Sequence, residues 1–326
     1  MARAMVAPGK GILAADESSG TITKRFEAIG VDSTFDSRRD YRQMLLTTPG
    51  LEEFVSGVIL YDETLRQSST DGVPFPKLLE GLGILPGIKV DTGAKPLPFS
   101  PEEKITEGLD GLPDRVKEYV SLGAKFAKWR AVITIGDGIP TDYCIEANAH
   151  ALARYASICQ EGGLVPIVEP EVLMDWENDI DTCYEVTKAA HVAVFNALRL
   201  HRVRLDGMIL KPNMAISGKK CPTQAGVEEV AEKTVKLLRE TVPAAVPGIA
   251  FLSGGQSADV ATLHLNAMNK LGPHPWQLSF SYGRALQDDA LKAWKGEASN
   301  NEAGQTALYQ RSKDNSQATS GSFAAA

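Results

Sequence analysis

Short apolar runs recur along the chain, and each is followed by a polar or glycine-containing turn. Eight of them have the composition of buried strands, at 11–18, 57–64, 87–91, 126–132, 164–171, 207–213, 248–255 and 278–284. Apolar residues at three- and four-residue spacing predict helices at 142–160, 226–242, 257–270 and 285–296. Strands that alternate with helices are typical of parallel sheets joined by crossover helices.

Two α/β folds fit this alternation, a closed barrel and a doubly wound open sheet. Eight strand–helix units favour a single-domain (β/α)8 TIM barrel, which we expect over residues 1–311. The open sheet is less favoured because no G-x-G-x-x-G follows the first strand. Residues 312–326 are small and polar, and they predict a flexible C-terminal tail.

Composition narrows the class of protein. The net charge of −7 gives no electrostatic support for nucleic-acid binding. Cys144, Cys159, Cys183 and Cys221 form no C-x-x-C pair and predict reduced thiols. No segment approaches the ~20 apolar residues of a membrane helix, and the N-terminus lacks the apolar core of a signal peptide. We therefore expect a cytoplasmic protein with no membrane or nucleic-acid partner.

The histidines show no spacing that is typical of a metal site. They are His150, His191, His201, His264 and His274. Neither H-x-H nor H-E-x-x-H occurs, and we expect all but His274 to lie on helices. We expect no metal and no cofactor.

Reactive side chains gather at one end of the predicted strands. In a barrel, the C-terminal strand ends meet around one pocket. Lys128 and Arg130 are two residues apart on one strand and face the same way, as do Glu169 and Glu171 on the next. The other strands place at this end Asp16, Glu17, Lys89, Asp91, Lys211, Ser253, Gly254, Gly255, Ser281, Gly283 and Arg284. Asp62 and Glu63, on the second strand, receive no specific role.

Lys211 ends the apolar run GMIL and precedes Pro212, which cannot continue a strand ladder. By itself this position also suits a lysine that extends to solvent. In a pocket of cations, desolvation and a nearby Lys128 would both lower its pKa. A shift from about 10.4 to roughly 7.5 requires about 4 kcal/mol and makes the amine a nucleophile. Glu169 could then transfer protons while an imine forms.

Glycine turns after the seventh and eighth strands predict a phosphate site. Ser253, Gly254 and Gly255 allow close approach of the backbone to an anion, and a helix begins shortly afterwards. SYGRAL, at 281–286, repeats this arrangement with Arg284 at the start of a helix. Phosphate sites at these two positions are common in barrels.

Seven segments resemble the signatures of class I fructose-bisphosphate aldolases, in order from about Val6 to Gly296. They are GKGILAADESSGTITKR, GIKVDTG, FAKWR, VPIVEPE, LKPNM, FLSGGQS and SYGRALQ. The resemblance implies a (β/α)8 barrel, usually a homotetramer, that needs no metal or cofactor. It also implies reversible cleavage of fructose 1,6-bisphosphate to dihydroxyacetone phosphate and glyceraldehyde 3-phosphate through a lysine Schiff base, in glycolysis, gluconeogenesis or the Calvin cycle.

The resemblance also implies a role for each catalytic residue. Lys211 would form the Schiff base, and Glu169 would be the acid/base for imine formation, with Glu171 supporting it. Asp16 would take the proton of the C4 hydroxyl, and Lys128 would hold charge on the reacting oxygens and keep the Lys211 pKa low.

The substrate contacts are carried over in the same way. The family contacts to the ketose 1-phosphate group match Ser253, Gly254, Gly255, Ser281 and Arg284. We add Gly283, which precedes Arg284, and Arg130, on the fourth strand, to the substrate-binding set. The other phosphate matches Ser18, Thr21, Arg25 and Lys89. Thr21 replaces a serine that is common in the family and keeps the hydroxyl.

Two departures from the family pattern stand out. Animal members end in a tyrosine that assists enamine protonation, whereas the last tyrosine here is Tyr309. We therefore expect slower enamine protonation, a weaker preference for the bisphosphate and a passive tail at 312–326. The chain also starts close to its first strand, without the leading helix of many members, so a trimmed N-terminus and a plastid location after removal of a targeting segment stay open.

Two other functions compete with this interpretation. A transaldolase-like or deoxyribose-phosphate-aldolase-like barrel would need only one phosphate neighbourhood, whereas this chain has two. A non-catalytic scaffold would be expected to have lost catalytic residues, whereas Asp16, Lys128, Glu169 and Lys211 are all present.

Overall fold

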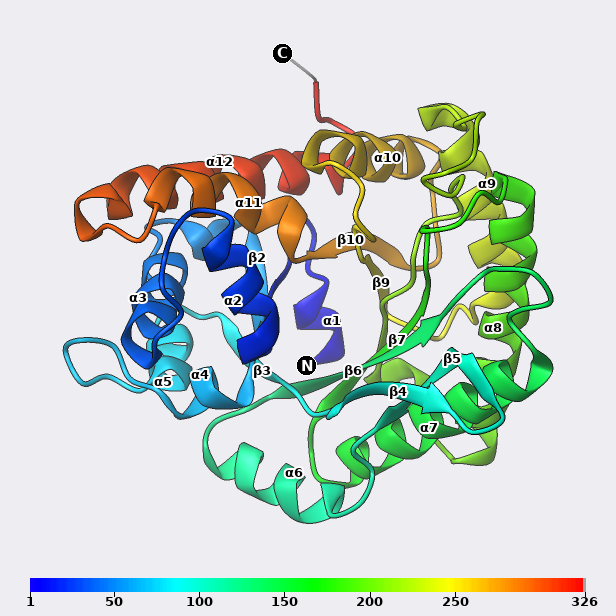
Figure 1. Cartoon of the computed structure of the whole chain (residues 1–326), viewed down its shortest axis with the longest axis horizontal. Helices are drawn as coiled ribbons and strands as arrows, with labels where there is room; N and C mark the ends of the chain where they lie inside the picture. Colours follow the sequence, from blue (N-terminus) through cyan, green and yellow to red (C-terminus); the bar gives the residue numbers. More distant parts are fainter. Residues whose placement is uncertain (325–326) are drawn as a thin grey trace.

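Eight parallel strands close into a barrel in the computed structural model, which describes residues 1–324 (Figure 1). The strands, each overlapping one predicted run, are β1 Gly11–Ala15, β2 Val55–Leu60, β3 Leu85–Lys89, β6 Phe126–Ile133, β7 Val165–Val172, β8 Ile209–Leu210, β9 Gly248–Phe251 and β10 Gln277–Tyr282. Their order around the barrel is β1-β10-β9-β8-β7-β6-β3-β2. The predicted (β/α)8 fold is confirmed.

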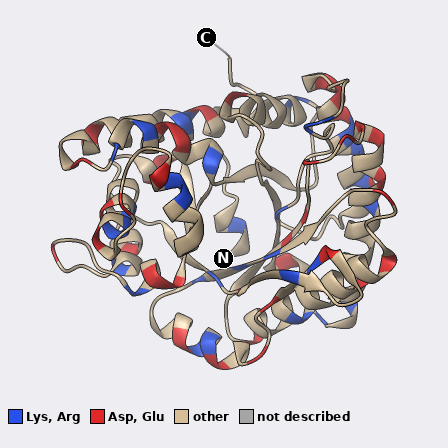
Figure 2. Cartoon of the chain, viewed as in Figure 1, with Lys and Arg blue, Asp and Glu red and all other residues tan. Residues whose placement is uncertain are grey.

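Helices surround the barrel. They are α2 Ser19–Glu27, α3 Phe35–Leu46, α4 Asp62–Arg66, α5 Phe75–Gly81, α6 Leu112–Ser121, α7 Asp142–Glu161, α8 Ile180–Leu200, α9 Val227–Thr241, α10 Ala258–Lys270, α11 Arg284–Trp294 and α12 Asn301–Ala318. Side-chain caps start several of them, since Thr141, Asp179 and Ser257 accept the backbone N–H three residues on. Figure 2 shows acidic and basic residues interspersed along these outer helices. An anion site must therefore come from a local cluster of cations.

The N-terminal end of the barrel interior is closed by apolar side chains. The short helix α1 (Ala2–Met5) lies within the ring of strands in Figure 1, and its Met5 packs against Ile12, Ile59 and Phe126 of the barrel interior. A Cβ at Gly87 would lie 2.2 Å from the Phe126 ring, so only glycine leaves room for this aromatic floor. Side chains that point into the other end of the barrel can therefore line a cavity above a closed base.

Helix α12 corrects the expectation of a flexible tail from residue 312. Residues 312–318 are helical, and Asn315 is buried, where its Oδ1 accepts a hydrogen bond from Thr262 of α10 at 3.0 Å. Beyond the helix, Phe323 N donates to Asn266 Oδ1 at 3.0 Å. The polar residues that suggest disorder are used here to join one helix to another. Residues 325 and 326 of the predicted tail lie outside the described residues.

Tyr309 lies in α12 and contacts the end of the barrel opposite the cavity. Its ring packs edge-on against Phe54, with the centroids 5.2 Å apart. Phe54 directly precedes β2, so this contact is at the N-terminal end of the barrel.

A two-stranded hairpin that the sequence pattern did not predict follows β3. Its strands are β4 Gly93–Leu97 and β5 Ser100–Glu107. Thr106 Oγ1 donates to the carbonyl of Arg130 at 2.7 Å, and Asn148 of α7 donates to the carbonyl of Lys104 at 2.8 Å. The hairpin thus supports the end of β6.

The thiols lie mostly inside the helical layer, and of the histidines His191 and His264 are buried. All four cysteines are free, and Cys144, Cys159 and Cys183 are buried. Between residues 1 and 324, no three histidine, cysteine or carboxylate side chains are grouped so as to hold a metal ion. In the same range, no helix is long and apolar enough to cross a membrane.

Candidate active site

A cavity of about 220 Å³ opens at the C-terminal ends of the strands. Its lining contains all the predicted site residues except Gly255, which lies beside it: Asp16, Ser18, Thr21, Arg25, Lys89, Lys128, Arg130, Glu169, Glu171, Lys211, Ser253, Gly254, Ser281, Gly283 and Arg284. A larger hollow of about 510 Å³ lies beside α1, but its charged lining residues Arg3, Arg204 and Asp206 are exposed rather than buried.

Lys211 is the first residue after β8. Its backbone N–H donates to the carbonyl of Val168 at 2.8 Å, and its side chain is buried rather than extended to solvent. Nζ lies 3.4 Å from Glu169 Oε1. Burial lowers the pKa of Lys211; Glu169 opposes this shift and the charge of Lys128 adds to it, with a net lowering. The site therefore favours the neutral amine.

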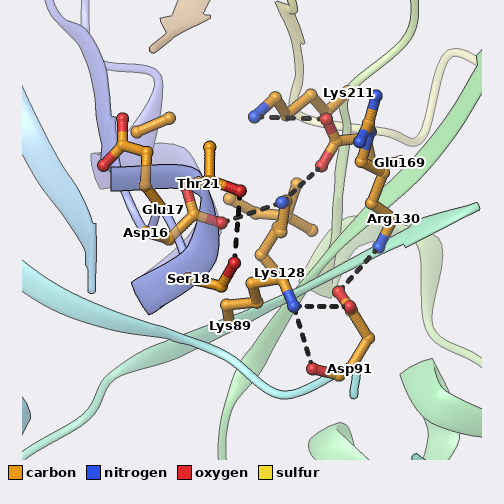
Figure 3. A network of polar contacts seen from close by, with 12 residues as sticks. Asp16, Glu17, Ser18, Thr21, Lys89, Asp91, Lys128, Arg130, Glu169 and Lys211 are labelled. Atoms are coloured by element: carbon orange, nitrogen blue, oxygen red, sulfur yellow. Dashed lines mark hydrogen bonds and ion pairs between the residues drawn. The ribbon is translucent and has the colours of Figure 1, made fainter. Parts of the chain in front are cut away.

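Lys128 lies at the centre of the cluster in Figure 3. Its Nζ is 2.9 Å from Asp16 Oδ2 and 3.2 Å from Glu169 Oε2. Burial would lower its pKa, but the carboxylates of Asp16, Glu169 and Asp91 outweigh it and raise the Lys128 pKa above its usual range. In return, Lys128 and Lys211 hold the pKa of Asp16 below its usual range, against the effect of its own burial. In the resting site, Lys128 is thus an ammonium group beside an ionised Asp16.

Glu169 joins the two lysines. One of its oxygens faces Lys211 and the other faces Lys128, and the residue is buried between them (Figure 3). Glu171, two residues on and therefore on the same face of β7, pairs with Arg130. The backbone N–H of Arg130 also donates to Asp91 Oδ2 at 3.3 Å. These contacts fix the ends of β6 and β7, which carry the central charges.

One group of polar side chains comes from the loops after β9 and β10. Gly254 and Gly255 have φ values of +59° and +91°, the left-handed region that favours glycine. Ser281 is buried, and its Oγ has no hydrogen-bond partner among the described residues. Arg284 opens α11 and also lines the cavity. This combination of free hydroxyl, glycine turn and guanidinium is suited to a phosphate group.

A second polar group comes from the loops after β1 and β3. Ser18 directly precedes α2, and its Oγ lies 3.2 Å from Thr21 Oγ1 (Figure 3). Arg25 pairs with Glu17 at 2.7 Å. Lys89 Nζ lies 2.6 Å from Asp91 Oδ1. The cavity thus has two separate sets of groups that can bind anions.

Three lining residues were assigned no role from the sequence: Ala14, Glu17 and Leu252. Of these, Glu17 has a structural role in the site. It pairs with Arg25 and also with the buried Arg42 at 2.7 Å. Its place beside Asp16 at the end of β1 was the only signal in the sequence. Asp62 and Glu63 lie outside the cavity, where they pair with Arg66 and Arg38.

The arrangement is suited to imine chemistry on a phosphorylated sugar. A buried amine with a lowered pKa can attack a carbonyl, and an adjacent carboxylate can move protons as water leaves. A fixed ammonium group can stabilise charge that develops on oxygen.

Comparisons with known proteins agree with this chemistry. The family profile described as fructose-bisphosphate aldolase class-I matches residues 1–326. A probable fructose-bisphosphate aldolase class 1 of Xanthomonas campestris is 59% identical over 323 residues, covering 99% of this chain and 97% of that protein. Fructose-bisphosphate aldolase 1 of Toxoplasma gondii is 55% identical over 324 residues, covering 99% of this chain and 89% of that protein.

A solved structure matches equally well. It is the fructose-bisphosphate aldolase of Plasmodium falciparum, crystallised with TRAP and a small-molecule inhibitor, and it superposes with a TM-score of 0.99 at 50% identity. The match covers 100% of this chain and 94% of that one. This chain therefore belongs to the class I fructose-bisphosphate aldolase family.

Proposed function

We propose that this protein cleaves fructose 1,6-bisphosphate reversibly to dihydroxyacetone phosphate and glyceraldehyde 3-phosphate, with Lys211 as the Schiff-base residue. The observation that carries the proposal is the buried Lys211 amine, 3.4 Å from Glu169, in a cavity with two anion-binding groups. The two groups favour a sugar with two phosphates over the single-phosphate substrates of other imine-forming barrels.

The first step joins the amine to the ketone. The neutral Lys211 nitrogen attacks the C2 carbonyl, and proton transfer through Glu169 lets the C2 oxygen leave as water, which yields a protonated imine. Glu169 is suited to this transfer because one of its oxygens lies 3.4 Å from Lys211 Nζ, within reach of the nitrogen that must lose protons. Glu171, paired with Arg130, holds the strand in place.

The second step breaks the carbon–carbon bond. Asp16 accepts the proton of the C4 hydroxyl, the C3–C4 bond cleaves, and its electron pair moves into the imine to form an enamine. Lys128, 2.9 Å from Asp16, remains cationic beside the reacting oxygens. Glyceraldehyde 3-phosphate leaves; protonation of the enamine carbon and hydrolysis then release dihydroxyacetone phosphate and free Lys211.

Borohydride trapping tests this assignment. Reduction in the presence of fructose 1,6-bisphosphate is expected to convert the imine to a stable amine on the peptide that contains Lys211, and Lys211→Met is expected to abolish both labelling and turnover. Lys125→Met is a matched control, since Lys125 pairs with Glu80 away from the cavity. Label on another lysine would overturn the mechanism, and faster cleavage of deoxyribose 5-phosphate would indicate the other class of aldolase.

We further propose that the reaction is independent of metal ions, because lysines supply the positive charge near the reacting oxygens. Turnover is expected to be unchanged after dialysis against EDTA. A loss that Zn²⁺ or Mg²⁺ restores would contradict this.

We also propose a cytoplasmic homotetramer. Exposed apolar side chains on α7 and α8, namely Tyr143, Val192 and Leu200, support association through these helices. A cytosolic fructose-bisphosphate aldolase of Arabidopsis thaliana is 52% identical to the chain. Light scattering would measure the mass of the particle in solution.

A further inference from the structure

The loop after β8 carries another lysine toward the cavity. Its backbone runs along the loop after β7, where Lys219 N donates to the carbonyl of Met174 at 2.7 Å. A Cβ at Gly218 would lie 2.1 Å from the carbonyl oxygen of Trp176, so only glycine permits this close approach. The backbone of Lys219 is therefore held firmly in one position.

The Lys219 ammonium group lies over the glycine turn that follows β9. A Cβ built on Gly255 would lie 2.8 Å from Lys219 Nζ and 3.0 Å from Arg284 Nη2. The two cations thus flank a single point beside the Gly255 α-carbon. Like charges this close repel each other, and an anion between them turns the repulsion into attraction.

Two independent observations indicate that an anion belongs at this place. Ser281 is buried beside the turn, and its Oγ has no hydrogen-bond partner within residues 1–324. Arg284 forms no ion pair within the same part of the chain, although it lines the cavity. Buried polar groups are rarely left without partners unless a ligand completes them, so the Ser281 hydroxyl indicates a ligand. The exposed Arg284 guanidinium is free to bind the same ligand.

The partner that Lys219 has in the structure is easily replaced. Its Nζ lies 3.0 Å from Asp175 Oδ1, and the two side chains are 44% and 64% exposed. Ion pairs this exposed contribute little to stability, because water screens them. A phosphate dianion carries more charge than a carboxylate and would also be bound by Arg284, so it competes well for Lys219.

We propose that Lys219 is a specificity-determining residue, which exchanges Asp175 for the phosphate next to the ketone of the substrate. The inference rests on the proposed aldolase function and deepens it. Lys219 would contact this phosphate together with Arg284, and it would favour ketoses that are phosphorylated at C1 over those that are not.

Kinetics in the condensation direction test this role, because the two substrates carry different phosphates. Dihydroxyacetone phosphate carries the phosphate next to the ketone, and glyceraldehyde 3-phosphate carries the other. Lys219→Met is expected to raise the KM for dihydroxyacetone phosphate about tenfold, with the KM for glyceraldehyde 3-phosphate unchanged. Lys219→Arg keeps the charge and should retain most of the affinity.

The neighbouring lysine provides the matched control. Lys220 Nζ lies 5.8 Å from the centre of the Trp176 ring, so Lys220→Met should leave both KM values unchanged. Asp175→Asn removes the competing carboxylate and should lower the KM for dihydroxyacetone phosphate or leave it unchanged. Equal KM values in Lys219→Met and the parent would overturn the proposal, as would an equal rise for both substrates.

The trapping experiment separates this proposal from the assignment of Lys211. If Lys219→Met still forms a reducible imine on Lys211 but shows no change in KM, only the Lys219 proposal fails. If no imine forms on Lys211 in the parent protein, the proposed function fails.

Discussion

The pKa of each buried lysine in this site depends on the charged groups that it contacts. Lys211 and Lys128 are both buried, yet their pKa values move in opposite directions. Lys128 contacts two carboxylates, Asp16 and Glu169, and these overcome the cost of burial. Among residues 1–324, Lys211 pairs with Glu169 alone, which it shares with Lys128, so burial prevails. The same side chain thus gives one permanent cation and one nucleophile.

This difference predicts a pH dependence at the residue scale. Imine formation needs neutral Lys211, so its rate should rise as the pH increases through the lowered pKa and should level off above it. Lys128→Met removes a positive neighbour and leaves Glu169 to act on Lys211 alone. Both changes stabilise the ammonium form of Lys211. The rise of the rate with pH should therefore occur about one pH unit higher than in the parent protein.

The measurement is the rate of borohydride-trapped imine as a function of pH, since this step precedes carbon–carbon cleavage. Lys188→Met, which removes a surface lysine paired with Glu240, controls for a general effect of net charge. A pH profile of Lys128→Met that is unchanged, or that shifts to lower pH, would contradict the effect of Lys128 on the Lys211 pKa.

At the scale of elements, the helix α12 shows how a polar segment can be structural. Arg311 pairs with Asp259 of α10 and Asp289 of α11, and Asn315 bonds to Thr262. The helix therefore joins two neighbours that each follow a strand of the cavity. Its lack of an apolar stripe conceals this role, because the contacts are hydrogen bonds and ion pairs between residues distant in the sequence.

Truncation tests the role of this helix. A chain that ends at Arg311 loses the Asn315–Thr262 hydrogen bond and exposes the covered face of α10, so its free energy of unfolding should fall by about 2 kcal/mol or more. A chain that ends at Gly321 keeps α12 and should lose less. Turnover per folded molecule should be equal in both, since no residue of α12 lines the cavity. Equal denaturant midpoints for the two chains would refute the structural role.

Across the whole molecule, buried histidines link stability to pH. His191 of α8 is fully buried, and burial lowers its pKa to about 4. Thr241 Oγ1 donates to the carbonyl of Leu237, so His191 Nδ1 is the donor to that hydroxyl at 3.0 Å. Nε2 is then a buried lone pair without a partner among the described residues. A proton on Nε2 would place an unpaired charge in the core.

The free energy of unfolding should therefore fall as the pH decreases. The unfolded chain binds a proton near pH 6.5, whereas the folded chain does so only near the lowered pKa of about 4, so stability is complete above 6.5 and decreases below it. His191 alone should account for about 2 kcal/mol between pH 6.5 and pH 5. Denaturant unfolding at pH 7 and pH 5 measures this, and His191→Gln should flatten the pH dependence. His150→Gln, at an exposed position of α7, should not change it; a parallel loss in all three proteins would exclude His191 as the cause.

Local sequence patterns were sufficient for the eight barrel strands and for the charged residues at their C-terminal ends. Apolar runs and helical spacing identify the eight barrel strands, and parallel closure brings their C-terminal ends together, so the residues at those ends could be predicted to share one cavity. The strands could be predicted because a strand forms according to the side chains within it. The shared cavity could be predicted because a parallel barrel places the C-terminal ends of all its strands at the same rim.

Contacts between distant parts of the chain lie beyond such patterns. The pairing of Lys128 with Asp16 joins residues 112 positions apart and makes one lysine a cation and the other a nucleophile. The β4–β5 hairpin, the anchoring of α12 and the approach of Lys219 to Gly255 depend in the same way on packing. Electrostatic and hydrogen-bond energies vary with distance and burial in space, and neither quantity is encoded by the spacing of residues along the chain.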